Sequence, residues 1–240
     1  MRIGRTLEHT WAALADLPTL LLKVQNRRLV SFRFCSALRQ FARGSSAGEI
    51  RHIIDVGANE GQFAFMARYC WPAARIESFE PDPSAAHQFR QNHCGDSKIQ
   101  LNECALGSLS GFVDLRLGTS SAQNSVCVEV GKNSRGTVRV KTDRLDESCH
   151  VEPNANALLK IDVQGYELPV LAGAERLLPL LRYVLIEVSL ADLFEGGSKL
   201  EDVWRFMRER GFTYHGILDM YHEPATGVAL QMDVIFARAS

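Results

Sequence analysis

The sequence predicts an α/β protein built on a largely parallel β-sheet with helices on both faces. From residue 50 onward, short apolar runs typical of strands alternate with segments of helical periodicity, which is the pattern of parallel β-α-β units. A glycine-containing turn at 53–61 joins the first strand to the first helix, and an acidic residue, Glu80, ends the second strand. These observations predict a crevice for a nucleotide-like ligand at the carboxyl ends of the strands.

Composition restricts the class of protein. The 240 residues suit one large domain or one domain with an extension, and 46% hydrophobic residues supply a sizeable core. A net charge of -1 gives no basic surface for nucleic acid. Six scattered cysteines without a C-x-x-C pair indicate free thiols in a reducing compartment, so we expect a cytoplasmic protein. No apolar run approaches the roughly 18 residues that a membrane span needs.

Residues 1–48 are predicted to form an N-terminal helical extension, and residues 49–240 the main domain. Apolar residues recur near helical spacing in this extension, at Leu14, Leu17, Leu21 and Leu22 and again at Phe34, Leu38 and Phe41. We expect a lid or a packing helix pair. Basic residues beside the leucines (Lys23, Arg27, Arg28, Arg33) leave a membrane-surface role open, and the extension is also a candidate for homo-oligomer formation.

Each element of the main domain follows from a local pattern. Strands are predicted at 51–56, 75–80, 98–104, 157–163, 183–189, 213–219 and 229–237. Helices are predicted at 61–70, 83–93, 167–181 and 199–210. The stretch 112–140 breaks this alternation, because valine-rich runs are separated by Gly118, Gly131 and Gly136. It therefore predicts a β insertion or long hairpins.

Two acidic strand ends flank the predicted ligand crevice. Asp55 ends the first strand, where it could fix the loop or accept a bond from a cationic group. Gly57 and Gly61 lack the Cβ atoms that would block a close approach of the ligand, although such a turn alone is a weak signal. Glu80 lies 25 positions after Asp55, near the spacing expected for the acceptor of a ribose diol. The alternative is a solvated strand-end carboxylate.

A second acidic pair is predicted at the tips of later strands. Asp162 stands between two apolar residues in the segment 160–167 and needs a partner there. With Glu187, at the next strand tip, it could act as a general base or a hard-cation site; two separately hydrogen-bonded carboxylates are the alternative. For Lys160, the sequence is equally consistent with a role in the site and with a charge on the surface. His215 is a further catalytic candidate at the far rim, where His222 is also expected, although a lone histidine is more often structural.

Several motifs, taken in order from about residue 52 to 237, resemble those of the FkbM-type methyltransferases. The most specific is Lys-Ile-Asp-Val-Gln-Gly-Tyr-Glu at 160–167. The others are Asp-Val-Gly-Ala-Asn-Glu-Gly at 55–61, Phe-Glu-Pro at 79–81, Glu-Cys-Ala-Leu-Gly at 103–107, Lys-Thr-Asp-Arg-Leu-Asp at 141–146, Ala-Gly-Ala-Glu at 172–175, Ile-Glu-Val at 186–188 and Asp-Val-Ile-Phe at 233–236. The resemblance implies a class I methyltransferase with a Rossmann-like sheet of seven mostly parallel strands and an antiparallel C-terminal strand.

The resemblance also implies roles for particular residues. S-adenosylmethionine would be the cofactor. Its amino acid part would be held by Asp55, Gly57, Asn59 and Gly61, its ribose by Glu80 beside Pro81, and its adenine would be bordered by Glu103, Cys104 and Ala105. Asp162 would lie beside the sulfonium and the acceptor. Some related O-methyltransferases use a divalent metal, for which Asp162 and Glu187 are the candidates here, and the sequence leaves this open.

The expected function is methylation of a hydroxyl on a sugar, glycan or glycosylated metabolite. A sulfonium carries an activated methyl group, so the protein mainly aligns the acceptor oxygen, and Asp162 could take its proton. A nicotinamide-dependent oxidoreductase is the first alternative, but Asn59 stands where a dinucleotide fingerprint has glycine. A non-catalytic cofactor-binding or assembly protein is the second. Acceptor specificity is expected in 112–140 and 190–198.

Overall fold

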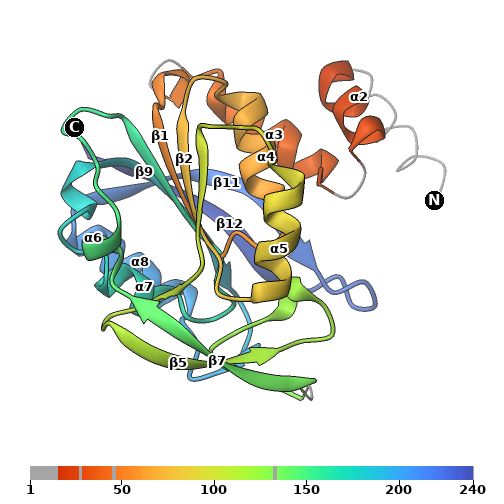
Figure 1. Cartoon of the computed structure of the whole chain (residues 1–240), viewed down its shortest axis with the longest axis vertical. Coiled ribbons are helices and arrows are strands. Elements are labelled where there is room, and N and C mark those ends of the chain that lie inside the picture. The colour runs from red at the N-terminus through yellow and green to blue at the C-terminus, as the bar shows by residue number, and fades with distance from the viewer. Residues whose placement is uncertain (1–15, 27–28, 45–46, 132–133, 240) are drawn as a thin grey trace.

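The computed structural model describes residues 16–26, 29–44, 47–131 and 134–239, and a seven-stranded sheet forms its centre (Figure 1). The strand order is β11-β12-β9-β8-β1-β2-β3. The strands are β1 (His52–Val56), β2 (Arg75–Phe79), β3 (Ile99–Asn102), β8 (Ala157–Ile161), β9 (Leu181–Ser189), β11 (Phe212–His222) and β12 (Ala229–Arg238). The five strands from β9 to β3 pair in parallel, whereas β12 is antiparallel to both of its neighbours. The predicted fold is therefore confirmed.

Helices cover both faces of the sheet because successive strand residues point to opposite sides. On one face lie α3 (Phe32–Ala42), α4 (Gln62–Cys70) and α5 (Pro83–Asn92), and on the other α6 (Leu145–Ser148), α7 (Glu167–Ala172) and α8 (Leu200–Glu209) (Figure 1). In β1, Ile53 belongs to the first core, with Leu38 and Phe63. The next residue, Ile54, belongs to the second core, with Leu145 and Val203.

The N-terminal segment contains two helices in its described part, α2 (Leu17–Gln25) and α3. Asp16 joins them, because its Oδ2 accepts bonds from Thr19 (2.7 Å) and Ser36 (2.8 Å) and its other oxygen pairs with Arg39. Residues 1–15, including Leu14, and residues 27–28 lie outside the described residues. Across the described ranges, no helix combines the length and the apolar character that crossing a bilayer requires.

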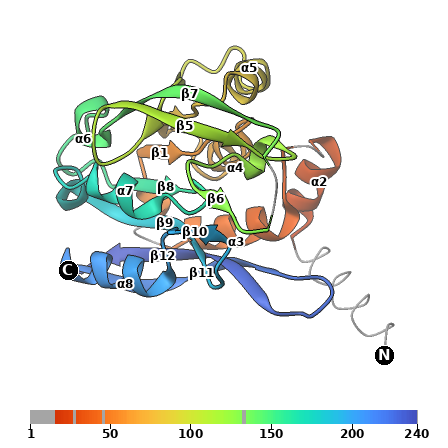
Figure 2. The same cartoon turned by 90° about the horizontal axis from the view of Figure 1, so that it is seen from below.

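The segment that breaks the alternation forms small sheets of its own. β4 (Ala105–Leu106), β7 (Gly136–Asp143) and β5 (Gly111–Leu117) make a three-stranded sheet, in which β5 and β7 are an antiparallel pair. Seen from below, β5 and β7 lie across the near end of the molecule (Figure 2). β6 (Val128–Glu129) pairs with β10 (Phe194–Glu195). This last pairing, which joins the segment 112–140 to the loop 190–198, was not predicted.

The predicted helix 167–181 is wrong in extent. Only Glu167–Ala172 is α-helical; turns follow, then a 3₁₀ segment at Leu178–Leu180, and β9 begins at Leu181. Glycine is a poor helix former, and the carbonyl of Gly173 accepts a bond from the Asp146 N–H (2.9 Å) rather than continuing the helix. Tertiary contact therefore overrides the apolar periodicity that suggested a longer helix.

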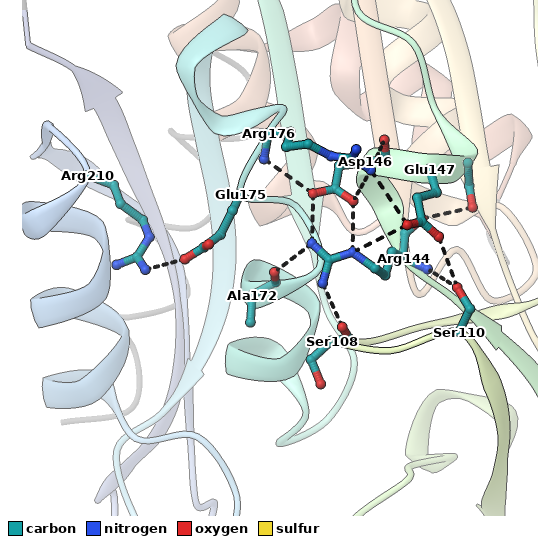
Figure 3. A network of polar contacts seen from close by, with 10 residues as sticks. Ser108, Ser110, Arg144, Asp146, Glu147, Ala172, Glu175, Arg176 and Arg210 are labelled. Atoms are coloured by element: carbon teal, nitrogen blue, oxygen red, sulfur yellow. Dashed lines mark hydrogen bonds and ion pairs between the residues drawn. The ribbon is translucent and has the colours of Figure 1, made fainter.

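A polar network links two of the family-like motifs, those at 141–146 and 172–175, away from the crevice (Figure 3). Arg144 donates to both oxygens of Asp146 (3.0 and 2.8 Å), to the Ser108 carbonyl (2.6 Å) and to the Ala172 carbonyl (3.3 Å). The Asp146 side chain is fully buried. Burial opposes ionisation, but the bonds from Arg144 and Arg176 outweigh it and lower the pKa of Asp146 to about 2. The network ties the segments around residues 107, 144 and 173 together.

Candidate active site

A cavity lies at the carboxyl ends of β1, β2 and β8, where an open α/β sheet binds its ligand. One wall comes from the main sheet and its loops: Val56, Gly57, Asn59, Phe79, Glu80, Pro81, Asp162, Val163, Gln164 and Tyr166. The opposite wall comes from the small sheets and the segment between β5 and β6: Cys104, Ala105, Leu106, Leu115, Ser121, Ala122, Asn124, Ser125 and Val126. Most of the residues predicted to bind the cofactor thus meet in one cavity, whereas Asp55, Gly61 and Glu103 do not line it.

The two glycines of the β1–α4 turn are required by protein packing, and Gly57 also lines the cavity, so the prediction that they allow a close approach of the ligand stays a prediction. Gly57 has φ +76°, and a Cβ there would lie 1.8 Å from the carbonyl oxygen of Asp162. Gly61 has φ +90°, and a Cβ there would lie 2.2 Å from Nε2 of His93. Both positions combine a left-handed backbone with a close contact, which only glycine tolerates.

Glu80 is held in place at the cavity wall by backbone groups. Its Oε2 accepts the N–H of Asn59 (2.7 Å) and its Oε1 accepts the N–H of Asp82 (2.8 Å). The residue is 6% exposed, and burial raises its pKa to about 7. A carboxylate oxygen accepts more than one bond, so each oxygen keeps capacity for a ligand hydroxyl. The solvated strand-end alternative is not what the structure shows.

Asn59 supplies a second polar group to the cavity. Its backbone adopts the left-handed region with φ 50°, which asparagine tolerates better than most residues. Its side-chain Oδ1 is buried and accepts no hydrogen bond from the described part of the chain. Buried polar atoms normally have a partner, so this oxygen is an acceptor ready for a ligand donor.

Asp55 and Lys160 form a buried ion pair below the cavity. Asp55 is fully buried, and its Oδ1 lies 3.2 Å from Nζ of Lys160. The same Nζ donates to the Gly57 carbonyl (3.0 Å) and lies 3.5 Å from Oδ2 of Asp162. Burial alone would lower the pKa of Lys160, but Asp55 and Asp162 outweigh it and raise the pKa. Lys160 is therefore an internal charge, and Asp55 does not line the cavity.

Three carboxylates lie in one row at this edge of the sheet. Asp162 follows the end of β8, and Glu187 of β9 is the register partner of Asp233 of β12. Burial raises the pKa of Glu187 well above its ordinary value, and Asp162 and Asp233 add to the effect. Burial, helped by Asp162, also raises the pKa of Asp233 to about 7. Asp233 was quoted only as part of a motif, because its place beside Glu187 depends on the antiparallel register.

Gln164 connects the first two members of this row. Its Nε2 donates to Oδ1 of Asp162 (2.9 Å) and to Oε2 of Glu187 (2.5 Å), and Gln231 donates to the same Glu187 oxygen (2.8 Å). Gln164 has φ 55°, a strained conformation that clusters at functional sites. Within the described ranges, the row does not gather three ligand atoms in the manner of a metal site. The side-chain amide of Gln164 thus lies between the two predicted metal ligands.

A strap formed by residues 121–126 closes the cavity from the side of the small sheet. Asn124 donates to Oδ2 of Asp82 (2.9 Å), and Ser125 donates through Oγ to the Gln164 carbonyl (2.6 Å). The strap therefore contacts the turns that carry both Glu80 and Asp162. Sequence reasoning placed specificity in this region without naming these residues, and no local pattern distinguishes them from other loop polar residues.

Other predicted site residues lie elsewhere. His215 packs edge-on against Phe41 (5.9 Å between ring centroids) and near Tyr183 (5.6 Å), on the helix face and away from the cavity lining. His222 ends β11 in register with Ala229 and does not line the cavity either. Glu103 is half exposed and pairs with Arg90, whereas its neighbours Cys104 and Ala105 line the cavity. We therefore assign no catalytic role to His215.

The sheet with one antiparallel strand, and the cavity between Glu80 and Asp162, define a Rossmann-like methyltransferase of class I. The chain belongs to the FkbM methyltransferase family, since the methyltransferase FkbM domain matches residues 55–214. The predicted family is confirmed, and the oxidoreductase alternative is not supported.

Named relatives are consistent with this family. The chain is 31% identical over 166 residues to the 2-O-methyltransferase NoeI of Sinorhizobium fredii, a match covering 63% of this chain and 68% of NoeI. It is 30% identical over 167 residues to the hexuronic acid methyltransferase AglP of Haloferax volcanii, covering 65% of this chain but only 60% of AglP. The solved structure of methyltransferase FkbM from Methylobacillus flagellatus shares the fold, with a TM-score of 0.50, 14% identity, and coverage of 93% of this chain and 60% of that one.

Proposed function

We propose that this methyltransferase transfers the methyl group of S-adenosylmethionine to a hydroxyl group of a sugar or glycan. The observation that carries the proposal is that Glu80 and Asp162 line one cavity, on either side of the loop that contains Gly57 and Asn59. The relatives NoeI and AglP, named for a 2-O-methyltransferase and a hexuronic acid methyltransferase, support a sugar acceptor.

The residues of the cavity fit the chemical groups of this cofactor. Glu80 accepts the two ribose hydroxyls, because backbone donors already fix both of its oxygens. The free Oδ1 of Asn59 accepts from the cofactor's ammonium group. Cys104, Ala105 and Leu106 give an apolar border for the adenine ring. When bound, the cofactor supplies an activated methyl group on a sulfonium, so the protein has only to align the acceptor and manage its proton.

Asp162 is the group that takes the proton of the attacking hydroxyl. Its side chain is one-third exposed and faces the cavity, while Gln164 fixes its Oδ1 and Lys160 lies beside its Oδ2. A positioned general base contributes about 10²–10⁴-fold to rate. Glu187 stands next along the row and accepts a hydrogen bond from Gln164, the residue that fixes Asp162; neither Glu187 nor Asp233 lines the cavity.

The charge of the row gives the acceptor a preferred chemistry. Asp162, the member of the row that lines the cavity, repels an anionic acceptor as a carboxylate, since like charges brought together cost binding energy. We propose a neutral sugar in preference to a hexuronate. The strap 121–126 and the loop that contains β10, joined through the β6–β10 pair, select among neutral sugars.

The test is methyl transfer from labelled S-adenosylmethionine to sugars with a free 2-hydroxyl, with 2-deoxy analogues and hexuronates as controls. We expect label on the neutral 2-hydroxy sugars, weaker transfer to hexuronates, and none to the 2-deoxy compounds. Transfer that is equal for all three classes would refute the acceptor assignment. If calorimetry detects no cofactor binding, the cofactor assignment is refuted and the non-catalytic alternative is supported.

A further inference from the structure

A second group of reactive side chains lies away from the cavity, near the amino ends of β1 and β2. His52 opens β1, Glu77 lies in β2, and Cys149 directly follows α6. Among the described residues, a ring nitrogen of His52, a carboxylate oxygen of Glu77 and Sγ of Cys149 all lie within 4.8 Å of one another. None of the three lines the cofactor cavity, so the proposed function does not account for their grouping.

The histidine nitrogen at the centre of this group has no hydrogen bond. His52 is 6% exposed, Glu77 4% and Cys149 8%, and Nε2 of His52 is buried without a hydrogen-bond partner in the described part of the chain. An unsatisfied buried polar atom is costly. A ligand bound at this nitrogen would remove that cost.

Arg75, a charged neighbour of this group, fixes the orientation of the Glu77 carboxylate. Arg75 pairs with Oε1 of Glu77, which leaves Oε2 facing His52 at 3.9 Å from Nε2. Tetrahedral coordination of zinc brings nitrogen and oxygen ligands to about 3.3 Å from each other, given metal–ligand distances near 2.0 Å. The two side chains therefore need to close by only about 0.6 Å. An outer partner such as Arg75 commonly orients a ligating carboxylate.

We propose that His52, Glu77 and Cys149 bind a zinc-class divalent cation. The ligands are Nε2 of His52, Oε2 of Glu77 and the thiolate of Cys149, and three protein ligands leave one position for water. Imidazole and thiolate favour zinc over magnesium or calcium. Binding forms the metal–sulfur bond and releases the thiol proton to solvent. The cation joins β1, β2 and the segment after α6, so its expected effect is stabilisation of the fold.

Equilibrium binding to the full-length, metal-stripped protein tests this site directly. We expect one Zn²⁺ per chain, and with Co²⁺ a thiolate-to-metal charge-transfer absorption in the near ultraviolet. Cys149→Ser should remove that absorption and weaken zinc binding at least tenfold, whereas Cys94→Ser, which alters an exposed cysteine, should leave both unchanged. Zinc should also raise the melting temperature of the wild type by mass action, and not that of Cys149→Ser.

A second variant keeps the test decisive if Cys149→Ser does not fold. Glu77→Gln retains the shape of the side chain and should weaken zinc binding at least tenfold, while the cobalt–thiolate absorption persists at higher Co²⁺. The proposal is overturned if the wild type binds no zinc at micromolar concentration, or if the variants bind it as tightly as the wild type. Either result leaves the methyl-transfer proposal untouched, since that proposal rests on different residues.

Discussion

Nζ of Lys160 lies 3.2 Å from Oδ1 of Asp55, in an ion pair that is almost completely closed to solvent. Removing one partner of a buried pair leaves an uncompensated charge and costs about 3–5 kcal/mol. We expect Lys160→Met to lower the free energy of unfolding by this amount in urea denaturation, and Asp55→Asn combined with it to recover part of the loss. Lys141→Met removes an exposed lysine paired with Asp143 and should leave the midpoint unchanged. Equal effects of the two lysine variants would contradict the structural role of the buried pair.

We expect cofactor affinity to depend on Glu80. Glu80→Ala removes the acceptor proposed for the ribose hydroxyls, and hydrogen bonds to a charged group contribute about 1.5–3 kcal/mol. We expect calorimetry to show S-adenosylhomocysteine binding weakened about 10- to 100-fold. The control is Glu103→Ala, since Glu103 is half exposed and bound to Arg90. If Glu103→Ala lost as much affinity as Glu80→Ala, we would conclude that Glu103 also contacts the cofactor.

The pH dependence of binding follows from the same carboxyl group. Burial raises the pKa of Glu80 from its usual 4.5 to about 7, so the free protein holds a proton there that the unfolded chain has already lost. Its contribution to folding stability is therefore present below about pH 4.5 and is lost as the pH rises through 7. Ribose hydroxyls favour the ionised form, so cofactor affinity should rise between pH 6 and 8, and Glu80→Gln should flatten this rise. A wild-type profile already flat across this range would be evidence against the ribose role.

Asp162 is expected to act in the chemical step and not in cofactor binding. Asp162→Asn keeps the side-chain shape but removes the base, so we expect kcat to fall about 10²–10⁴-fold with S-adenosylhomocysteine affinity changed only a few-fold. Asp219→Asn, which alters an acidic residue of β11 bound to Arg33 (3.1 Å), should keep kcat within about twofold of the wild type. Single-turnover methyl transfer measures the step. If Asp162→Asn retained wild-type kcat, another group would have to take the proton.

The Arg144 network should govern resistance to acid. Its partner Asp146 has a lowered pKa of about 2 in the folded state, so its stabilising contribution is present above the usual value near 4 and is lost as the pH falls toward 2. We expect Arg144→Met to shift acid unfolding, followed by circular dichroism, to higher pH. Arg208→Met, at an exposed position of α8, should unfold at the wild-type pH. Coincident acid transitions for the two variants would show that the network does not stabilise the fold.

Local patterns were sufficient for the parts of the protein that are set within one β-α unit. The glycine turn, Glu80 and Asp162 were predicted to lie at strand ends, and the structure places them there. Parallel strands bring these ends together at one edge of the sheet. Contacts between residues far apart in the sequence were not predicted. Asn124 lies 42 positions from Asp82, and nothing in its immediate neighbours signals that contact. The helix predicted to reach residue 181 failed for the same reason, since Gly173 uses its carbonyl for Asp146.

The contact between Gly57 and the carbonyl of Asp162 has a mechanical consequence. The Asp162 N–H also donates to the Val56 carbonyl (3.0 Å), so the turn proposed to face the methyl donor and the strand end that carries the proposed proton acceptor are in direct backbone contact. There is no hinge between these two parts, and neither can shift without the other. Adaptation to a new acceptor therefore has to come from the strap 121–126 and the loop containing β10, while the distance from donor to base is inherited unchanged.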